Sequence, residues 1–182
     1  FGISFEEYMS IEFNGCINLM KGAIDYSDYV TTVSPTYAEQ IKTPEYAHGL
    51  ENILIKNSGK LRGILNGVDV DTYNPKTNKA LFENYDSESL DKKIEGKKEL
   101  QKMLSLPVNG DVPVIAMITR LASHKGIDIV RKAMNDILKN EVQFIILGTG
   151  EIDHEEYFKY IQNSYDNKVR SIISFNKDLA HK

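Results

Sequence analysis

The sequence PVIAMITRLASHKGIDIVRKAMNDILKNEVQFIILGTG, residues 113–150, decides the fold class of this chain. Residues 113–118 and 142–147 are continuous apolar runs, each too short for an ordinary helix and typical of a strand buried on both faces of a parallel sheet. Between them, residues 126–139 place apolar side chains on one face of a helix. Strand, helix and strand in this order predict a right-handed crossover unit of an α/β fold.

The same alternation continues beyond residue 150. Residues 154–165 predict a second amphipathic helix, and residues 169–175 predict a third strand. Three strands that alternate with two helices and are joined by short loops predict a doubly wound parallel α/β sheet. In such sheets ligands bind beyond the carboxyl ends of the strands. The loops after Ile118, Leu147 and Phe175 are therefore the candidate site.

The first third of the chain predicts further α/β elements. Residues 17–26 predict a helix and residues 29–33 a β-branched strand. A new helix is expected to start at Ser34-Pro35, because a Ser side chain caps free backbone N–H groups and Pro lacks the N–H that the first turn leaves unbonded.

A fourth strand and a connector separate these two regions. Residues 61–65 predict the strand, and Asn66-Gly67 predicts the turn that ends it, since both residues tolerate positive φ. Polar and charged residues then become frequent between Asp71 and Lys98, which marks a connector.

Composition excludes several classes of protein. The chain has 182 residues, 41% of them hydrophobic and 26% charged, and a net charge of −4, so it is expected to be globular and not a nucleic-acid binder. No apolar run is long enough for a membrane span, so a soluble cytoplasmic protein is expected. The single Cys16 excludes an internal disulfide and a thiolate zinc site. Because the chain starts at Phe1 without Met, we expect a piece of a longer protein.

The loop after Ile118 carries the strongest chemical signal. Arg120 and Lys125 lie just past a strand and at the mouth of a helix, whose free N–H groups and positive dipole end favour an anion. An Arg fork and a Lys point charge suit a diphosphate. The alternative is that both are solvated loop charges. His124 lies between them and is either another ligand contact or a structural residue.

Other candidate residues give weaker signals. Gly148 and Gly150 allow a close approach of the backbone to a ligand, with Glu151 next to them, but a glycine pair after a strand is also ordinary turn geometry.

The four histidines have no metal-like spacing, so no metal site is expected: His48, His124, His154 and His181. No Gly-x-Ser-x-Gly elbow is present, which excludes that type of hydrolase. Five tyrosines either line a sugar groove or serve in packing: Tyr26, Tyr29, Tyr37, Tyr46 and Tyr73.

Seven segments, spread over nearly the whole chain, carry a family resemblance. They are Glu12-Phe-Asn-Gly15, Lys21-Gly-Ala-Ile-Asp-Tyr-Ser-Asp28, Thr31-Thr-Val-Ser-Pro-Thr-Tyr-Ala-Glu39, Gly63-Ile-Leu-Asn-Gly-Val-Asp69, Asn74-Pro75, Thr119-Arg-Leu-Ala-Ser-His-Lys-Gly126 and Leu147-Gly-Thr-Gly150. In this order and spacing they resemble the bacterial glycogen synthases and plant starch synthases, which transfer glucose from ADP-glucose to an α-1,4-glucan.

The resemblance implies a GT-B fold, in which two Rossmann-like domains face each other across a cleft. Residues 1–66 would be the end of the N-terminal, acceptor-side domain, residues 67–98 the hinge, and residues 99–182 the first half of the nucleotide-sugar domain. The implied activity is retaining glucosyl transfer from ADP-glucose to the non-reducing end of a glucan, in glycogen biosynthesis in the bacterial cytoplasm, without an obligatory metal or other cofactor.

The resemblance also assigns residues. Arg120 and Lys125 match the basic pair that binds the nucleotide diphosphate and stabilises charge on the departing ADP, a catalytic role. Asn66 matches a substrate-binding Asn at the cleft, and Gly148 and Gly150 match the loop beside the substrate. The chain departs from the usual loop at three positions, Thr119, Ala122 and His124.

Three further expectations complete the interpretation. The family's Lys-Thr-Gly-Gly loop and catalytic His would lie before Phe1, and its Glu-Pro-Cys-Gly segment after Lys182, so we expect no turnover by this chain alone. One alternative is another GT-B glycosyltransferase that uses a UDP- or GDP-sugar. The second is a non-catalytic Rossmann-like binding module, which would expose an apolar sheet edge and self-associate.

Overall fold

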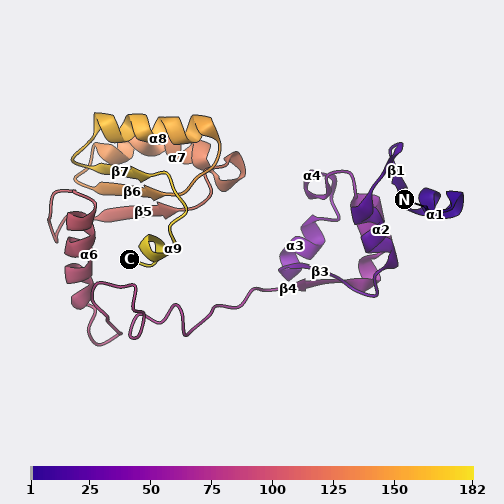
Figure 1. The fold of residues 1–182 in the computed structure, drawn as a ribbon, viewed down its shortest axis with the longest axis horizontal. Coiled ribbons are helices and arrows are strands. Elements are labelled where there is room, and N and C mark those ends of the chain that lie inside the picture. Colours follow the sequence, from indigo (N-terminus) through magenta and orange to yellow (C-terminus); the bar gives the residue numbers. More distant parts are fainter. Residues whose placement is uncertain (1) are drawn as a thin grey trace. The chain divides into compact units, whose positions relative to one another are not determined.

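The computed structural model describes residues 2–182 and divides the chain into two compact units, residues 1–68 and residues 69–182 (Figure 1). Each unit contains a parallel sheet with helices packed on it. The predicted α/β class with parallel sheets is confirmed. No helix within residues 2–182 is long and apolar enough to cross a membrane.

The unit of residues 69–182 contains the strongly predicted part of the sequence. Its three strands are parallel and lie in chain order: β5 (Val114–Ile118), β6 (Gln143–Leu147) and β7 (Val169–Ile172). The crossovers are α7 (Ile127–Leu138) and α8 (Ile152–Ser164), which lie side by side over one face of the sheet (Figure 1). The predicted order of elements is confirmed, although β7 ends three residues before the predicted end at Phe175.

The core of this unit lies between the two crossover helices and the sheet. Phe144 and Ile146 alternate along β6 and face this core, because successive side chains of a strand point to opposite faces. They pack against fully buried side chains of the helices, among them Met134 of α7 and Phe158 of α8. Burial of such large apolar side chains contributes about 1.5–3 kcal/mol each.

Strand β6 is buried along its whole length, as predicted, but β5 is not. Ile115 is 38% exposed and Ile118 is 54% exposed, so the prediction of a strand buried on both faces is wrong for β5. The reason is position in the sheet. Strand β6 has a neighbour at each edge, whereas β5 pairs only with β6 among the described residues.

A helix that the sequence did not predict covers the beginning of β6. Helix α6 (Lys92–Met103) starts inside the stretch expected to be a connector. Its buried Gln101 donates from Nε2 to Gln143 Oε1 over 2.9 Å, and both amides also bond backbone groups of residues 107–109. These bonds satisfy a polar pair that would otherwise be costly to bury.

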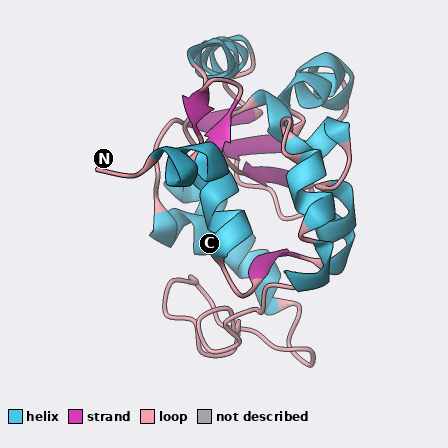
Figure 2. Cartoon of the chain, turned by 90° about the vertical axis from the view of Figure 1, so that its right-hand side faces the viewer, coloured by secondary structure: helices cyan, strands magenta, loops and turns pink. Residues whose placement is uncertain are grey.

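Residues 69–91 contain no helix or strand and form the loops drawn in pink at the bottom of Figure 2. They are held to the short helix α9 (Lys177–His181). Asn78 Nδ2 lies 3.0 Å from His181 Nδ1, the Tyr73 and His181 rings stack at 5.0 Å, and Lys182 Nζ donates to Ala80 O over 2.6 Å.

The unit of residues 1–68 has two parallel strands, β3 (Val30–Val33) and β4 (Leu61–Ile64). Its small core is formed by Ile24, Ala47 and Leu54. The remaining elements are α1 (Phe5–Ile11), the hairpin of β1 (Glu12–Phe13) and β2 (Cys16–Ile17), α2 (Leu19–Tyr26), α3 (Pro35–Gln40), α4 (Pro44–Ala47), α5 (Glu51–Lys56) and the 3-10 turn η1 (Ser58–Lys60).

Two local predictions in this unit have different outcomes. Ser34 caps α3 as predicted, because its Oγ accepts from Tyr37 N over 3.0 Å and Pro35 is the first helical residue. The turn predicted at Asn66-Gly67 is wrong. Residues 65–69 run on from β4 without a turn, and neither Asn66 nor Gly67 has a positive φ.

Candidate functional site

A cavity of about 710 Å³ lies at the carboxyl ends of β5, β6 and β7, in the unit of residues 69–182. All three loops that the sequence singled out line it. The loops contribute Thr119 and Arg120, Gly148 and Thr149, and Asn176 and Lys177, and the cavity is completed by Ile118, Leu147, Ser174 and Phe175 from the predicted strands and by Tyr73, Ala180 and His181. The predicted location, beyond the carboxyl strand ends, therefore coincides with a real cavity.

Arg120 lies in this cavity two residues after β5 ends. Its side chain is exposed and makes no hydrogen bond or ion pair with any described residue. An unpaired guanidinium in a cavity is available to an anionic ligand, which it can bind through two parallel N–H groups.

Gly148 and Gly150 are explained by the packing of two loops. A Cβ on Gly148 would lie 1.9 Å from Thr119 O, and a Cβ on Gly150 would lie 2.0 Å from Leu121 O. Backbone hydrogen bonds continue the β5–β6 pairing there, from Thr119 N to Leu147 O and from Leu121 N to Thr149 O. The glycines thus let the loop that bears Arg120 pack directly on the next loop. Gly148 lines the cavity and Gly150 does not.

Lys125 occupies a different place from Arg120. It ends the 3-10 turn η2 (Ser123–Lys125), and Gly126, with φ of 73°, connects it to α7. Its side chain is exposed, but it is not among the residues that line the cavity. Asn66 belongs to the other unit, so the cavity is formed without it.

The loop between Arg120 and Lys125 is tied to the start of α8. Ser123 donates from its backbone N and its Oγ to the two carboxylate oxygens of Glu151, over 3.1 and 3.0 Å. These hydrogen bonds, first the one from the Ser123 backbone, lower the pKa of Glu151. Both hydrogen bonds favour the ionised form of the carboxylate, which accepts them.

Two rings at the cavity provide flat apolar surfaces. Phe175 is 92% exposed, and Tyr73 is 61% exposed with its ring stacked on His181. Sequence reasoning missed Phe175 as a site residue because it was placed in the third strand, as its last residue, whereas β7 ends at Ile172. The signal that would have found it is its position next to Asn176, which caps α9 and so ends the strand earlier.

The five tyrosines are divided between the two units of the chain. Tyr26 lines a cavity of about 620 Å³ and Tyr37 and Tyr46 line one of about 280 Å³, both in the unit of residues 1–68, while Tyr73 belongs to the cavity of the other unit. Tyr29 lies under the Arg62 guanidinium at 5.9 Å. Within the unit of residues 1–68, Tyr26 therefore does not share a cavity with Tyr37 and Tyr46.

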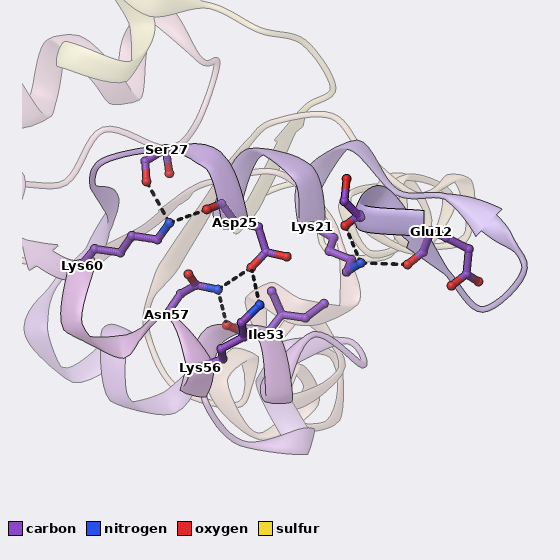
Figure 3. Close-up of polar contacts among 9 residues, drawn as sticks. Glu12, Lys21, Asp25, Ser27, Ile53, Lys56, Asn57 and Lys60 are labelled. Atoms are coloured by element: carbon purple, nitrogen blue, oxygen red, sulfur yellow. Dashed lines mark hydrogen bonds and ion pairs between the residues drawn. The ribbon is translucent and has the colours of Figure 1, made fainter. Parts of the chain in front are cut away.

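The 620 Å³ cavity is polar, but its charged groups are already bonded to other groups of the same unit (Figure 3). Lys21 Nζ donates to the backbone carbonyls of Ser10 and Glu12, over 2.6 and 3.0 Å. Asp25 accepts from Asn57 Nδ2 over 2.8 Å and pairs with Lys56 at 3.6 Å. These side chains hold the fold of the unit together. Within residues 2–182, no group of three or more His, Cys, Asp and Glu is placed to share a metal ion.

Comparison with known proteins shows which families have a sequence and a fold similar to those of this chain. Residues 2–56 match the model of the starch synthase catalytic domain family. The chain is 45% identical to a glycogen synthase of Clostridium botulinum (strain Alaska E43 / Type E3) over 100% of its length and 38% of that protein. It is 49% identical to a glycogen synthase of Thermosipho africanus over 94% of its length and 36% of that protein.

Solved structures agree with these relatives. The catalytic domain of starch synthase IV from Arabidopsis thaliana, bound to ADP and acarbose, superimposes with a TM-score of 0.88 and 33% identity over 99% of this chain and 38% of that one. Anabaena Alr3699/HepE, in complex with UDP and glucose, shares the fold with a TM-score of 0.52 and 16% identity, over 87% of this chain and 36% of that one. The chain is a homologue of the glycogen and starch synthases and spans about 38% of the length of the relatives with which it aligns in full.

Proposed function

We propose that the protein is a glucosyltransferase that moves glucose from ADP-glucose to the non-reducing end of an α-1,4-glucan with retention, and that the 710 Å³ cavity holds the ADP part. The observation that carries the proposal is the pairing of a free guanidinium, Arg120, with an exposed ring, Phe175, in one cavity at the strand ends. The ADP and acarbose bound to the similar starch synthase domain support the same substrate classes.

The proposed chemistry assigns a task to each residue. In the reaction the bond between glucose C1 and the diphosphate oxygen breaks, a bond from C1 to the glucan 4-oxygen forms on the same face of the sugar, and the 4-hydroxyl proton passes to the departing diphosphate. Negative charge develops on the departing diphosphate. Arg120 and Lys125 would stabilise that charge together with the N–H groups at the start of α7, and Phe175 would stack on the base.

The proposal extends to the domains. Residues 1–66 would serve the acceptor side, with Asn66 at the cleft, residues 67–98 would be the hinge, and residues 99–182 would begin the nucleotide-sugar domain. Gly148 and Gly150 would shape the wall next to the sugar nucleotide. The substrate ADP-glucose would serve without an obligatory metal, in a bacterial cytoplasm.

Isothermal titration calorimetry of the chain with ADP-glucose and with UDP-glucose tests the nucleotide site. We expect Arg120→Ala to weaken ADP-glucose binding by about 10- to 100-fold, because hydrogen bonds between charged groups are lost. Lys125→Ala should weaken it less. The matched control is Lys132→Ala, an exposed lysine on α7, which should bind like the parent. Equal affinity in Arg120→Ala would contradict the site, and equal or tighter binding of UDP-glucose would contradict the choice of nucleotide.

Transfer is tested in a chimera, in which this chain replaces the matching segment of the Clostridium botulinum glycogen synthase. Incorporation of labelled glucose into a maltooligosaccharide is measured. Activity with ADP-glucose that Arg120→Ala abolishes would support the proposal. A folded chimera that binds ADP-glucose but does not extend the glucan would contradict the proposed reaction.

A further inference from the structure

Glu151 holds the middle of the loop that carries the two cations. Ser123 lies between Arg120 and Lys125, and both of its donors reach the carboxylate of Glu151, 28 residues away. Glu151 is the residue before α8 but makes no capping hydrogen bond to that helix with its side chain. Its carboxylate is therefore used on the loop and not on the helix that follows it.

The buried ring of His154 lies next to this carboxylate. The residue is only 3% exposed, and its Nε2 lies 3.4 Å from Glu151 Oε2 and 3.4 Å from Ser123 Oγ. Its Nδ1 lies 3.0 Å from Arg131 Nη1. A guanidinium can only donate, so Nδ1 must accept, and the neutral ring then carries its proton on Nε2. That N–H faces the carboxylate and the hydroxyl.

Arg131 is in turn fixed by Tyr157. The guanidinium lies 4.5 Å above the Tyr157 ring, and the Tyr157 hydroxyl donates to Arg131 O over 3.1 Å. Burial raises the pKa of Tyr157, which further favours the protonated hydroxyl that donates this bond. A continuous series of contacts thus links α7 and α8 to the loop of residues 120–125. It runs from Tyr157 through Arg131, His154 and Glu151 to Ser123.

We propose that Glu151 and His154 are positioning residues, which fix the loop of residues 120–125 so that Arg120 and Lys125 are held ready for the two phosphates of the ligand. The inference rests on the proposed function, because it needs a diphosphate at that loop. A loop that is already ordered pays less conformational entropy when it binds, which raises affinity without any added ligand contact. The gain should therefore depend on the phosphates and not on the nucleoside.

The test compares ADP with adenosine, which lacks both phosphates, by NMR titration of the chain. We expect Glu151→Ala to weaken ADP binding about tenfold, since the loop loses two charge-assisted hydrogen bonds, and to leave adenosine binding unchanged. Glu151→Gln keeps an acceptor for Ser123 N and should recover part of the loss. His154→Phe should act in the same direction as Glu151→Ala. The matched control is Glu156→Ala, an exposed carboxylate of the same helix that pairs with Lys159.

Hydrogen exchange of the Ser123 amide provides a second readout. Its protection should fall in Glu151→Ala and stay unchanged in Glu156→Ala. If Glu151→Ala lowers the affinity for ADP and for adenosine by the same factor, Glu151 either contacts the nucleoside or stabilises the folded chain in general. In both cases the inference is wrong. An unchanged ADP affinity in Glu151→Ala and in Ser123→Ala also contradicts it.

The two proposals fail in different ways. A parent chain that binds ADP no tighter than adenosine, or an Arg120→Ala variant that keeps the preference for ADP, removes the diphosphate site itself and with it the proposed function. If Arg120→Ala loses the preference for ADP over adenosine but Glu151→Ala keeps it, the diphosphate site stands. Only the positioning role of Glu151 is then contradicted.

Discussion

Lys60 and Arg120 are both cations next to a parallel strand, but only one of them is used by the fold. Lys60 Nζ donates to Asp25 O and to Ser27 O, each over 2.8 Å, at the start of β4 (Figure 3). Arg120, just after β5, has no side-chain partner among the described residues and lies in a cavity. The comparison separates cations that satisfy backbone carbonyls from cations that remain for a ligand.

Two further cations belong with Lys60. Lys21 bonds the carbonyls of Ser10 and Glu12, and Arg170 donates from Nε to Leu104 O over 2.6 Å. The Arg170 guanidinium also bonds backbone carbonyls at residues 105, 166 and 169. A positive residue therefore indicates a ligand site only when the fold leaves its donors unused.

The largest effect should come from removing Arg170. Arg170→Met keeps an apolar stem but leaves the carbonyls that end α6 and start β7 without their donor, and we expect a loss of about 3 kcal/mol in the free energy of unfolding. Arg120→Met, which breaks no bond inside the chain, should stay within about 0.5 kcal/mol of the parent.

Urea unfolding followed by circular dichroism measures both, since the chain has no Trp for fluorescence. Peptide-level hydrogen exchange then assigns the change to the unit of residues 69–182. Equal losses in Arg170→Met and Arg120→Met would remove the distinction between the two classes of cation.

A smaller effect on stability should follow when single lysines are replaced by methionine. Lys60→Met removes one ammonium that serves two carbonyls and should cost about 2 kcal/mol of stability. Lys125→Met should cost under about 0.5 kcal/mol, because its exposed ammonium has no partner among the described residues. For ADP affinity, measured by calorimetry, the order should reverse, with Lys125→Met weakened and Lys60→Met unchanged. A Lys60→Met chain that loses ADP affinity while it remains folded would contradict this separation.

Sequence periodicity predicted what depends on neighbours along the chain. The apolar runs located β5 and β6, and helical spacing located α7 and α8, because burying an apolar face is a local pattern. Helix α6 was missed because the side chain it buries is Gln101, a polar residue with no apolar periodicity around it.

The site was predicted only in part, for a related reason. The loops at the carboxyl strand ends follow from parallel topology, so Arg120 and Gly148 were found. The role of His154 depends on Arg131 and Ser123, which lie 23 and 31 residues away along the chain, and no spacing rule joins them. The exposure of β5 likewise depends on which strands flank it, which a single apolar run does not reveal.

The smallest effect concerns Asp25, the anion of the structural network in Figure 3. Burial raises its pKa, but the hydrogen bond from Asn57 and the charge of Lys56 outweigh burial, so the pKa of Asp25 is lower than usual. A lowered pKa in the folded chain means that the carboxylate stabilises the fold above about pH 4 and that this contribution is lost as the pH falls through the folded-state pKa.

Thermal unfolding from pH 7 down to pH 2 therefore separates Asp25→Asn from the parent. The parent should be more stable at pH 7, and the difference should shrink below about pH 4, where the unfolded chain binds the proton before the folded chain does. Asp28→Asn, an exposed carboxylate just after α2, is the matched control and should follow the parent at every pH. A difference between Asp25→Asn and the parent that stays constant down to pH 2 would mean that the side chain acts through packing and not through its charge.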